Sequence, residues 1–569
     1  MNKQFQQLEE LEMLRRKIES KESAYNPEIQ MLTSPFSSPG YHTTIKKADV
    51  IHSTLHSLIY ALGLLDTEEE RYEARAFDIF AKVVSLQDTD RSRNTFGIWS
   101  WFYEEPLEQM SPPDWNWADF CGKQLVLALS RHGEKFPVQL YAEVKQAIYN
   151  ACDAIIKRDV GPGYTNIAIM GAFVTLVAGE VFGEKRYETY GLNRLEKLHQ
   201  FTQVRQAFQE YNSPTYTTVA ILELSKLHTE TKLERAKQLS GELLDMAWSS
   251  VADYYHAATG QWSGPHSRCY NTLLNNNHKA FLQYATGGTL QFFEWVDFPY
   301  DEEWYKSGIH CPEATAARML VAEERELQKC FAINEHDQSE KWATTYMTPN
   351  YTLGTFNKEI MWNQTRTLLA YLDNGGQPTY MHLRCLHDGY DYCSAIFNSA
   401  QREEHVLYGV HFITNGGDTH PNLDKIDGMI EATDFRLRLE ISGCLERMES
   451  QAEGKEAVIR IGGASGITIT LHNWFAAFDD RQAEDASWRW EINEVDGVLG
   501  VDWVIYSGER KTIDFRQIRQ AAFLFTMLLN SEGQALSPTI QKSKDQISIS
   551  GEWNHEQMSL TLPLRGSDW

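Results

Sequence analysis

The sequence lacks the signatures of several common enzyme classes. It contains no P-loop, no G-x-G-x-x-G in a βαβ setting, no G-x-S-x-G and no H-E-x-x-H. These absences argue against nucleotide enzymes, α/β-hydrolases and zinc proteases of that type. The eight cysteines are scattered and form no C-x-x-C pair, so neither a zinc ribbon nor a disulfide framework is indicated.

Basic residues are also scarce. The chain has 53 Lys and Arg against 78 Asp and Glu, for a net charge of −25. Partners with a negatively charged surface, such as nucleic acids and membranes, need basic protein surface, so both are excluded as expected partners. A long polyanion would be repelled at range, whereas a short anionic ligand held in a locally basic pocket is compatible with this charge.

Long apolar runs are not apparent either, and no run is expected to span a bilayer. The first 23 residues are charged and amphipathic, have the spacing of one solvated helix, and lack the apolar core of a signal peptide. The sequence therefore predicts a cytoplasmic protein, and it leaves a homo-oligomer open.

What the sequence has is length and helical periodicity. Its 569 residues exceed what one hydrophobic core holds. Apolar residues recur at spacings of three and four, which predicts helices at Lys47–Leu65, Thr67–Leu86, Trp115–Ser130, Val138–Arg158, Thr165–Phe182, Lys185–Val204, Pro214–Leu227 and Lys232–Tyr255. Short and long connections alternate, which favours helix hairpins stacked as an (α/α) toroid with the long loops on one face.

From Thr344 the pattern changes to short, alternating segments rich in β-branched and aromatic residues, separated by Gly, Asn and Asp. That pattern is typical of an antiparallel β-sandwich. The sequence around NEHDQSEKW is the best boundary. We therefore expect a toroid over residues 1–335 and a β-sandwich over residues 336–569.

Two polar segments are the main candidates for a site. The first is Glu210–Tyr216, in which Ser213 and Pro214 are typical of a helix start. A helix start does not explain the other polar and aromatic residues of this turn, which are Glu210, Tyr211, Asn212 and Tyr216.

The second segment is Gly264–Tyr270. A turn needs none of His266, Arg268 and Tyr270, which together supply a base, a fixed cation and a weak acid.

Other candidates are weaker. The aromatic segment with Trp99, Trp101 and Trp115 can form a sugar platform or a packed cap over helices. Asn363 and Arg366 begin a predicted strand and can complete a pocket. A structural metal near His411, Asp418 and His420 is conceivable, but their loose spacing and the Gly416–Gly417 pair favour a simple turn. No cofactor is expected.

These motifs and this layout resemble the heparinase II/III-like and alginate-lyase-like polysaccharide lyases. The resemblance implies β-elimination beside a uronic acid, with an anionic oligosaccharide as substrate. It implies that Asn212 and Arg268 hold the carboxylate, that His266 or Tyr216 is the base, and that Tyr270 is the acid. Glu210 and Tyr211 would contact the sugar. Several such lyases have an Asn-His dipeptide at this place, but here Asn212 is followed by Ser213. The chain does contain an Asn277-His278 dipeptide, but its surroundings resemble a helix start.

Two other functions stay open at this stage. A glycoside hydrolase on the same scaffold would need two carboxylates across a cleft, and Glu210, Glu104, Asp114 and Asp119 are candidates. A non-catalytic sugar-binding protein would use the same loops without turnover.

Overall fold

The computed structural model describes residues 3–38, 42–334, 338–462, 466–479, 481, 488–529, 537–553 and 555–569. The chain forms two compact units. The helical unit comprises Met1–Gln209, Thr218–Trp248 and Ala280–Cys311, and the β unit comprises Glu210–Thr217, Ser249–Lys279 and Pro312–Trp569. The expected boundary at 335/336 is thus replaced by a division in which two loops of the helical sequence belong to the β unit.

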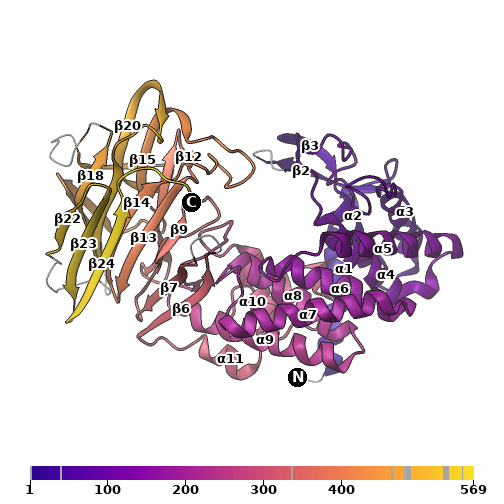
Figure 1. The fold of residues 1–569 in the computed structure, drawn as a ribbon. Coiled ribbons are helices and arrows are strands. Elements are labelled where there is room, and N and C mark those ends of the chain that lie inside the picture. Colours follow the sequence, from indigo (N-terminus) through magenta and orange to yellow (C-terminus); the bar gives the residue numbers. More distant parts are fainter. Residues whose placement is uncertain are drawn as a thin grey trace. The chain divides into compact units, whose positions relative to one another are not determined.

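Helices dominate the first part of the chain (Figure 1). The α-helices are α1 (Lys3–Ser20), α2 (Thr54–Asp66), α3 (Glu73–Val84), α4 (Trp117–His132), α5 (Val138–Arg158), α6 (Thr165–Phe182), α7 (Lys185–Arg205), α8 (Pro214–Glu230), α9 (Glu234–Tyr254), α10 (Asn276–Ala285) and α11 (Glu313–Arg318). A small antiparallel sheet of β1 (Tyr25–Asn26), β2 (Met31–Ser37) and β3 (Lys47–His52) precedes α2. Short 3₁₀ turns are η1 (Glu22–Ala24), η2 (Glu70–Tyr72), η3 (Gly133–Lys135), η4 (Trp295–Asp297) and η5 (Glu302–Trp304).

The helices pair as hairpins in two rows. Helices α2, α4 and α6 contact one another in turn, and each packs against its hairpin partner α3, α5 or α7. The row of α2, α4 and α6 is the more buried: 15 of the 18 residues of α6 are buried, against 6 of the 21 residues of α7. This double row is the arrangement expected of an (α/α) toroid, and the amphipathic outer helices carry the polar surface.

Helix α6 corrects the expectation that no apolar run could span a membrane. Within the described residues it has the length and composition to do so, with a hydropathy of 1.6 over 18 residues. However, 83% of that window is buried inside the protein. Its inner position explains its composition, because a helix surrounded by other helices has no face that needs polar residues.

Helix α1 was expected to be solvated, and this expectation is wrong for its inner face. Leu14 and Ile18 are both 0% exposed. A Cβ at Gly63 of α2 would lie 2.6 Å from Ile18 Cδ1, so the glycine makes room for the isoleucine and lets α1 pack closely on α2.

The β unit is an antiparallel sandwich, as predicted. The larger sheet has the order β19-β20-β15-β11-β10-β8-β7-β6, with β12 paired to β11, and the smaller has the order β16-β17-β18-β21-β14-β13-β9. Two further small sheets are β22-β23-β24 and β4-β5. The bounds are β4 (Tyr255–His256), β5 (Gln261–Trp262), β6 (Arg325–Ile333), β7 (Glu340–Met347), β8 (Tyr351–Phe356), β9 (Lys358–Ile360), β10 (Leu368–Asp373), β11 (Pro378–His387), β12 (Tyr390–Asp391), β13 (Ala395–Arg402), β14 (His405–Phe412), β15 (Met429–Gly443), β16 (Met448–Glu453), β17 (Glu456–Ile461), β18 (Ile467–Phe478), β19 (Trp490–Val495), β20 (Val498–Asp514), β21 (Ala521–Leu529), β22 (Thr539–Lys542), β23 (Gln546–Trp553) and β24 (Glu556–Pro563).

One continuous apolar core joins the two large sheets. It contains inward-facing residues of β10, β11, β15 and β20 from one sheet and of β13, β14, β18 and β21 from the other. The sandwich begins at Arg325, earlier than the change of sequence pattern at Thr344. The sequence did not reveal this start, because the edge strand β6 carries few buried residues and so lacks the apolar alternation of the inner strands.

Buried histidines make the stability of the β unit depend on pH. His405 of β14 is 0% exposed, and its ring stacks on Trp553 with the ring centroids 3.3 Å apart. Within the described residues neither ring nitrogen has a hydrogen-bond partner, and burial lowers the pKa of His405 to about 4. The unfolded histidine has a pKa of about 6.5. The unfolded chain therefore takes up a proton between pH 6.5 and 4 that the folded chain does not.

We expect His405→Phe, which keeps an aromatic ring over Trp553, to flatten this dependence. The native contribution is present above pH 6.5 and falls by at most about 1.4 kcal/mol per pH unit below it. Urea unfolding at pH 5, 6 and 7 measures the slope, with the exposed His310→Phe as control. A slope that His405→Phe leaves unchanged would refute the assignment.

Candidate functional site

Two loops that are distant in sequence, in Glu210–Thr217 and Ser249–Lys279, meet within the β unit. The backbone N–H of Ser267 donates to the carbonyl of Tyr211 at 3.1 Å, and the Ser267 hydroxyl donates to the same oxygen at 2.9 Å. Ser213 Oγ donates to the carbonyl of Arg268 and accepts from the N–H of Tyr216 at 3.0 Å. The predicted helix cap at Ser213 is therefore present, and it also ties the two loops together.

Asn212 fixes the second loop from inside. It has a positive φ of 47°, a conformation that asparagine tolerates better than most residues, and it is 4% exposed. Its amide nitrogen donates to the carbonyls of Ser263 and Pro265 at 2.7 and 3.0 Å, and its amide oxygen accepts from Trp262 Nε1 at 2.7 Å. These bonds engage the whole amide, which gives Asn212 a positioning role in place of the expected contact with a substrate carboxylate.

His266 is likewise interior. It is 0% exposed, and its Nδ1 lies 2.5 Å from the carbonyl oxygen of Asn212. Because that oxygen only accepts, Nδ1 carries the proton. Burial lowers the pKa of His266 to about 3, so the ring is neutral near pH 7. The backbones of His266 and Arg366 exchange two hydrogen bonds, at 2.9 and 3.2 Å. His266 therefore supports the loop, in place of the expected role as a base in contact with substrate.

Arg268 is the centre of the exposed part of the cluster. Its guanidinium donates to Glu210 Oε1 at 2.9 Å and to Gln364 Oε1 at 3.0 and 3.1 Å. Its Cζ lies 4.1 Å from the ring centroid of Tyr216 and 5.6 Å from that of Trp362. The Arg268 side chain is 23% exposed and that of Glu210 is 7% exposed. A cation is thus held in one orientation with an edge toward solvent.

Tyr216 and Tyr270 form a phenol pair beside this cation. Their hydroxyl oxygens are 2.7 Å apart and their ring centroids 6.0 Å apart. Burial raises the pKa of Tyr216 well above its usual range, although Arg268 works in the opposite direction. Tyr216 therefore keeps its proton, whereas Tyr270 is 55% exposed and presents its hydroxyl to solvent.

The predicted strand-start residues complete this cluster. Asn363 donates to the hydroxyl of Tyr390 at 2.8 Å. Arg366 is 5% exposed and donates to the Asn363 carbonyl at 2.6 Å and to Thr272 Oγ1 at 3.1 Å. Arg366 is therefore a buried residue that links the loops by hydrogen bonds, and Asn363 lies nearer the surface.

Sequence reasoning did not select Gln364 and Trp362. Both contact Arg268, and their only sequence signal was that they adjoin Asn363. Tyr211 was selected as a substrate contact and is instead a core residue. It is 3% exposed, bonds through its hydroxyl to that of Tyr254, and stacks on Phe331 at 4.7 Å.

The aromatic segment of the candidate sugar platform lies in the helical unit. Trp99 is 0% exposed and donates to the carbonyl of Val83 at 2.9 Å, which makes it a core residue. Trp101 lies with its ring centroid 5.1 Å from that of Trp117, and Trp115 donates to the carbonyl of Asn94 at 3.0 Å. Of the three candidates, Trp101 and Trp115 are partly exposed, as is the neighbouring Trp117.

Of the four carboxylates considered for hydrolysis, Glu210, Glu104 and Asp114 are engaged by other side chains, and Asp119 is buried. Glu104 pairs with His52. Asp114 is 6% exposed and accepts from Trp101 Nε1 at 3.2 Å and the N–H of Asn116 at 3.0 Å. Burial raises the pKa of Asp119 to about 7, a value suited to a general acid, but Asp119 is only 2% exposed.

The residues considered for a metal have other contacts. His411 lies in β14, 4% exposed and 3.0 Å from Asn398 Nδ2. Asp418 pairs with His387 at 2.9 Å, and His420 Nδ1 accepts from the backbone of the following turn. Within the part of the chain that the structure describes, no three His, Cys, Asp or Glu side chains are grouped to hold a metal ion.

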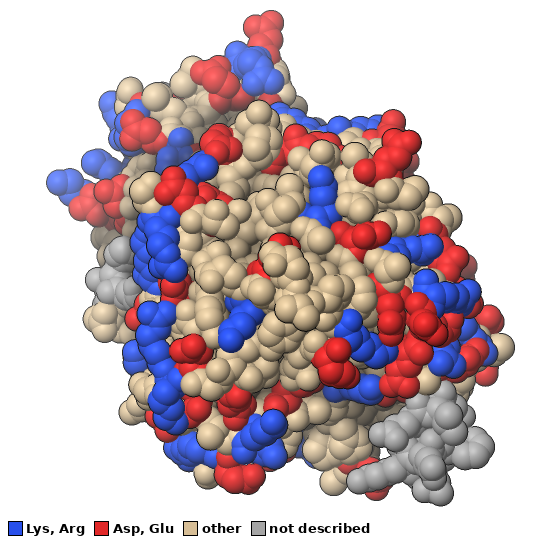
Figure 2. Space-filling model, turned by 90° about the vertical axis from the view of Figure 1, so that its right-hand side faces the viewer, with Lys and Arg blue, Asp and Glu red and all other residues tan. Residues whose placement is uncertain are grey.

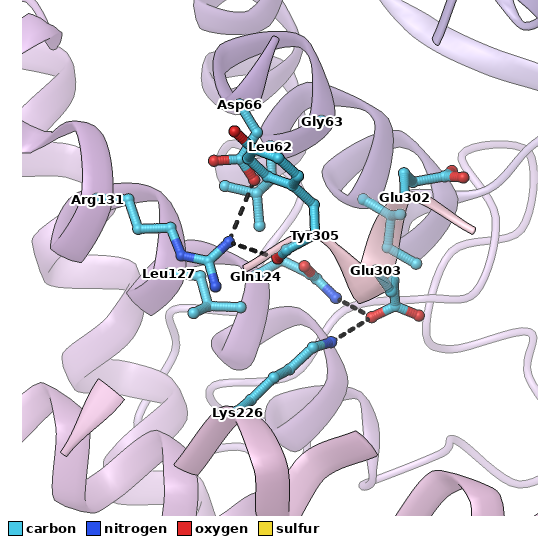
Figure 3. Close-up of a pocket in the computed structure, with 11 residues that line it drawn as sticks. Leu62, Gly63, Asp66, Gln124, Leu127, Arg131, Lys226, Glu302, Glu303 and Tyr305 are labelled. Atoms are coloured by element: carbon cyan, nitrogen blue, oxygen red, sulfur yellow. Dashed lines mark hydrogen bonds and ion pairs between the residues drawn. The ribbon is translucent and has the colours of Figure 1, made fainter. Parts of the chain in front are cut away.

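A small cavity lined by charged groups lies in the helical unit. Its volume is about 10 Å³, which is room for about one water molecule. Figure 3 shows Arg131 directed toward Asp66 and Lys226 directed toward Glu303. Behind it, Lys123 bonds Glu223 at 2.6 Å and Glu303 at 3.0 Å. This cavity is too small for a substrate, so its charges serve the fold.

Charged residues do not form one acidic surface on the face drawn in Figure 2. Acidic and basic side chains are intermingled there, and uncharged side chains cover much of the centre. The excess of acidic residues in the sequence does not gather into one patch on this face.

Comparisons with known proteins give three findings. The profile of a family described as a domain of unknown function (DUF8769) matches residues 12–287, a range that includes both site loops. No curated protein sequence matches the chain. Solved structures of polysaccharide lyases match it over most of its length.

The structure titled heparinase III has 11% sequence identity and a TM-score of 0.44, and the match covers 90% of this chain and 82% of that one. A chondroitin AC lyase from Streptomyces coelicolor has 9% identity and a TM-score of 0.43, with 98% and 94% of the two chains covered. A heparan sulfate lyase from Pedobacter heparinus has 10% identity and a TM-score of 0.31, with 90% and 82% covered.

Proposed function

We propose that this protein is a carbohydrate lyase that cleaves uronic-acid-containing oligosaccharides by β-elimination at the Arg268 cluster. The observation that carries the proposal is the phenol pair: an exposed Tyr270 hydroxyl lies 2.7 Å from the hydroxyl of Tyr216, beside the guanidinium of Arg268. Elimination beside a carboxylate needs a group that moves the proton and a group that stabilises the developing charge, and the exposed phenol and the oriented cation can supply these.

In this proposal Arg268 binds the uronate carboxylate. Removal of the C5 proton builds negative charge beside that carboxylate, and a fixed guanidinium stabilises the charge as it develops. Glu210 and Gln364 hold the guanidinium in place by hydrogen bonds of 2.9 to 3.1 Å. Asn212 and His266 position the loop that carries Arg268.

Tyr270 is proposed as the proton carrier. As a phenolate it takes the C5 proton, the C5–H electron pair becomes the C4–C5 double bond, and the bond from C4 to the leaving oxygen breaks. The Tyr270 hydroxyl then gives the same proton to the leaving oxygen. Tyr216 keeps its own proton, because burial raises its pKa, and its hydroxyl lies within hydrogen-bond distance of the Tyr270 oxygen at 2.7 Å. Protons balance over the cycle, and no cofactor is required.

A glycoside hydrolase is the alternative, but no observation favours it at this cluster. Glu210 is buried against Arg268, and hydrolysis needs two carboxylates that reach the same glycosidic bond. We also propose that short oligosaccharides are preferred over polymer, because the net charge of −25 repels a long polyanion. A cytoplasmic location stays a prediction of the sequence.

A screen of uronate-containing oligosaccharides for an unsaturated, ultraviolet-absorbing product tests the proposal. We expect turnover of at least one of them, and we expect Arg268→Ala to lower kcat/KM by about 10²–10³-fold because it removes the cation at the developing charge. Glu210→Gln keeps a group that can accept from Arg268, and it should retain activity within about tenfold. Loss of all activity in Glu210→Gln, with Arg268→Ala only mildly impaired, would favour hydrolysis instead.

A further inference from the structure

The β unit has a second hollow, separate in its lining from the Arg268 cluster. It has a volume of about 260 Å³, slightly below the range of about 300–1,000 Å³ for drug-sized ligands. Its walls come from β6, β7, β8, β13 and β24, and it is lined by Gln328, Trp342, Thr344, Thr355, Asn357, Ser399, Ala400, Gln401, Arg402, Gln557, Met558 and Ser559. We propose that this hollow is a non-catalytic binding site for an uncharged sugar ring of an oligosaccharide.

The chemistry of the lining suits sugar hydroxyls. Eight of the twelve lining residues carry an uncharged hydroxyl or amide side chain. Such groups both donate and accept hydrogen bonds, as sugar hydroxyls do. Arg402 is the one charged residue among the twelve, and its Nε is bonded to Glu556 at 2.7 Å. The lining therefore offers mainly neutral donors and acceptors.

The floor of the hollow is a buried polar network. Thr355, Ser399 and Gln401 are 1%, 8% and 6% exposed. Thr355 Oγ1 donates to Gln401 Oε1 at 2.8 Å, and Ser399 Oγ lies 3.0 Å from Thr355 Oγ1.

The Gln401 amide in turn donates to the carbonyls of Leu353 and Glu403 at 3.0 and 3.1 Å. These bonds hold the polar groups in one orientation before any ligand arrives. The polar floor and the apolar core of the sandwich thus lie in the same unit, and the floor faces the hollow.

One wall of the hollow is an oriented aromatic ring. Trp342 of β7 is 37% exposed. Its indole N–H donates to Glu340 Oε2 at 2.9 Å, and its backbone N–H donates to Asn357 Oδ1 at 2.8 Å. The ring is therefore held in place with part of its surface available. An aromatic face packs well on the C–H face of a sugar, and this combination of a ring and amides favours a pyranose over a purely apolar ligand.

Isothermal titration calorimetry of the full chain tests the site. The probes are uncharged hexasaccharides of glucose, xylose, mannose and galactose, each titrated separately, with a uronate hexasaccharide as the charged comparison. We expect at least one neutral probe to bind with a Kd of about 1 mM or tighter. Trp342→Ala should weaken that binding at least about tenfold, and Trp295→Ala, an exposed tryptophan of the helical unit, should leave it unchanged.

A second variant covers the case in which Trp342→Ala does not fold. Gln328→Ala combined with Gln557→Ala removes two exposed amides from the rim and should weaken the same binding by about five- to tenfold. The proposal is overturned if no neutral probe binds at about 10 mM, or if binding survives both variants. It is also overturned if Arg268→Ala abolishes the binding, because that result would place the sugar at the other cluster. Since binding is read without turnover, the outcome does not depend on the proposed lyase activity.

Discussion

Replacing Tyr270 with phenylalanine should lower kcat on the oligosaccharide found by the screen by about 10²–10⁴-fold, the range for loss of a general acid–base group. The substitution removes only the hydroxyl that lies 2.7 Å from that of Tyr216. Because Tyr270 is 55% exposed, the free energy of unfolding should change by less than about 0.5 kcal/mol. KM should change little, since Arg268 still binds the carboxylate.

Steady-state kinetics together with urea unfolding separates these effects. Tyr103→Phe is the matched control, because Tyr103 is an exposed tyrosine at 39% and lies in the helical unit. It should leave both kcat and stability at wild-type values. A Tyr270→Phe enzyme with near-wild-type kcat would remove Tyr270 from the mechanism and leave Tyr216 as the remaining phenol to test.

Replacing Glu303 with glutamine should destabilise the helical unit by about 2–4 kcal/mol, somewhat less than the cost of breaking a fully buried ion pair from one side, because the Glu303 side chain is 23% exposed while its lysine partners are buried. Glu303 Oε1 lies 3.0 Å from Lys123 Nζ and 3.2 Å from Lys226 Nζ. Burial alone would raise the pKa of Glu303, but the two lysines lower it below its usual range. Without the carboxylate, two buried ammonium groups face the single charge of Glu223, which lies 2.6 and 3.8 Å from them.

The charge balance provides a direct control for this prediction. Glu303→Gln combined with Lys226→Met leaves Lys123 paired with Glu223 and should recover most of the lost stability, because a neutral cluster no longer holds an unpaired charge. Urea unfolding of the single and double variants measures the difference. If both variants are equally unstable, side-chain packing, and not charge balance, holds this region together.

Periodicity was enough to locate most helices. Val138–Arg158 and Thr165–Phe182 were predicted with the bounds observed for α5 and α6, because their apolar residues recur without interruption. The predicted helix Lys47–Leu65 was wrong in its first part, where β3 ends at His52 before α2 begins at Thr54. Strand and helix follow one another there without a breaker, so the apolar pattern continues across the change.

The sequence singled out two loops that lie together in the fold, but it could not predict the surroundings of several of their residues. Both loops carry polar side chains that a helix cap or a turn does not need, and the two loops contact each other in the structure. Burial is a tertiary property, however, and nothing local in the sequence distinguishes the interior His266 and Tyr211 from the exposed Tyr270. The positive φ of Asn212 and the closure of its amide on Ser263 and Pro265 also depend on the folded loop.

The division of the chain was the other feature hidden from the sequence. Composition changes once, near residue 340, but the β unit also takes in Glu210–Thr217 and Ser249–Lys279. These segments join it through hydrogen bonds such as that from the N–H of Cys269 to the carbonyl of Gln364 at 2.6 Å. Such long-range pairing leaves no trace in local composition, which is why a single linear boundary was expected.

The most direct test of the proposed chemistry is the fate of the solvent oxygen. The oligosaccharide cleaved in the screen is treated with the enzyme in water labelled with heavy oxygen, and both product halves are analysed by mass spectrometry. Elimination predicts one unsaturated sugar for every bond cleaved and no label in either product at early times, before reducing ends exchange with solvent. One labelled oxygen for every bond cleaved, with no unsaturated sugar, would show hydrolysis and contradict the assignment of Arg268 and Tyr270 as the groups that carry out β-elimination.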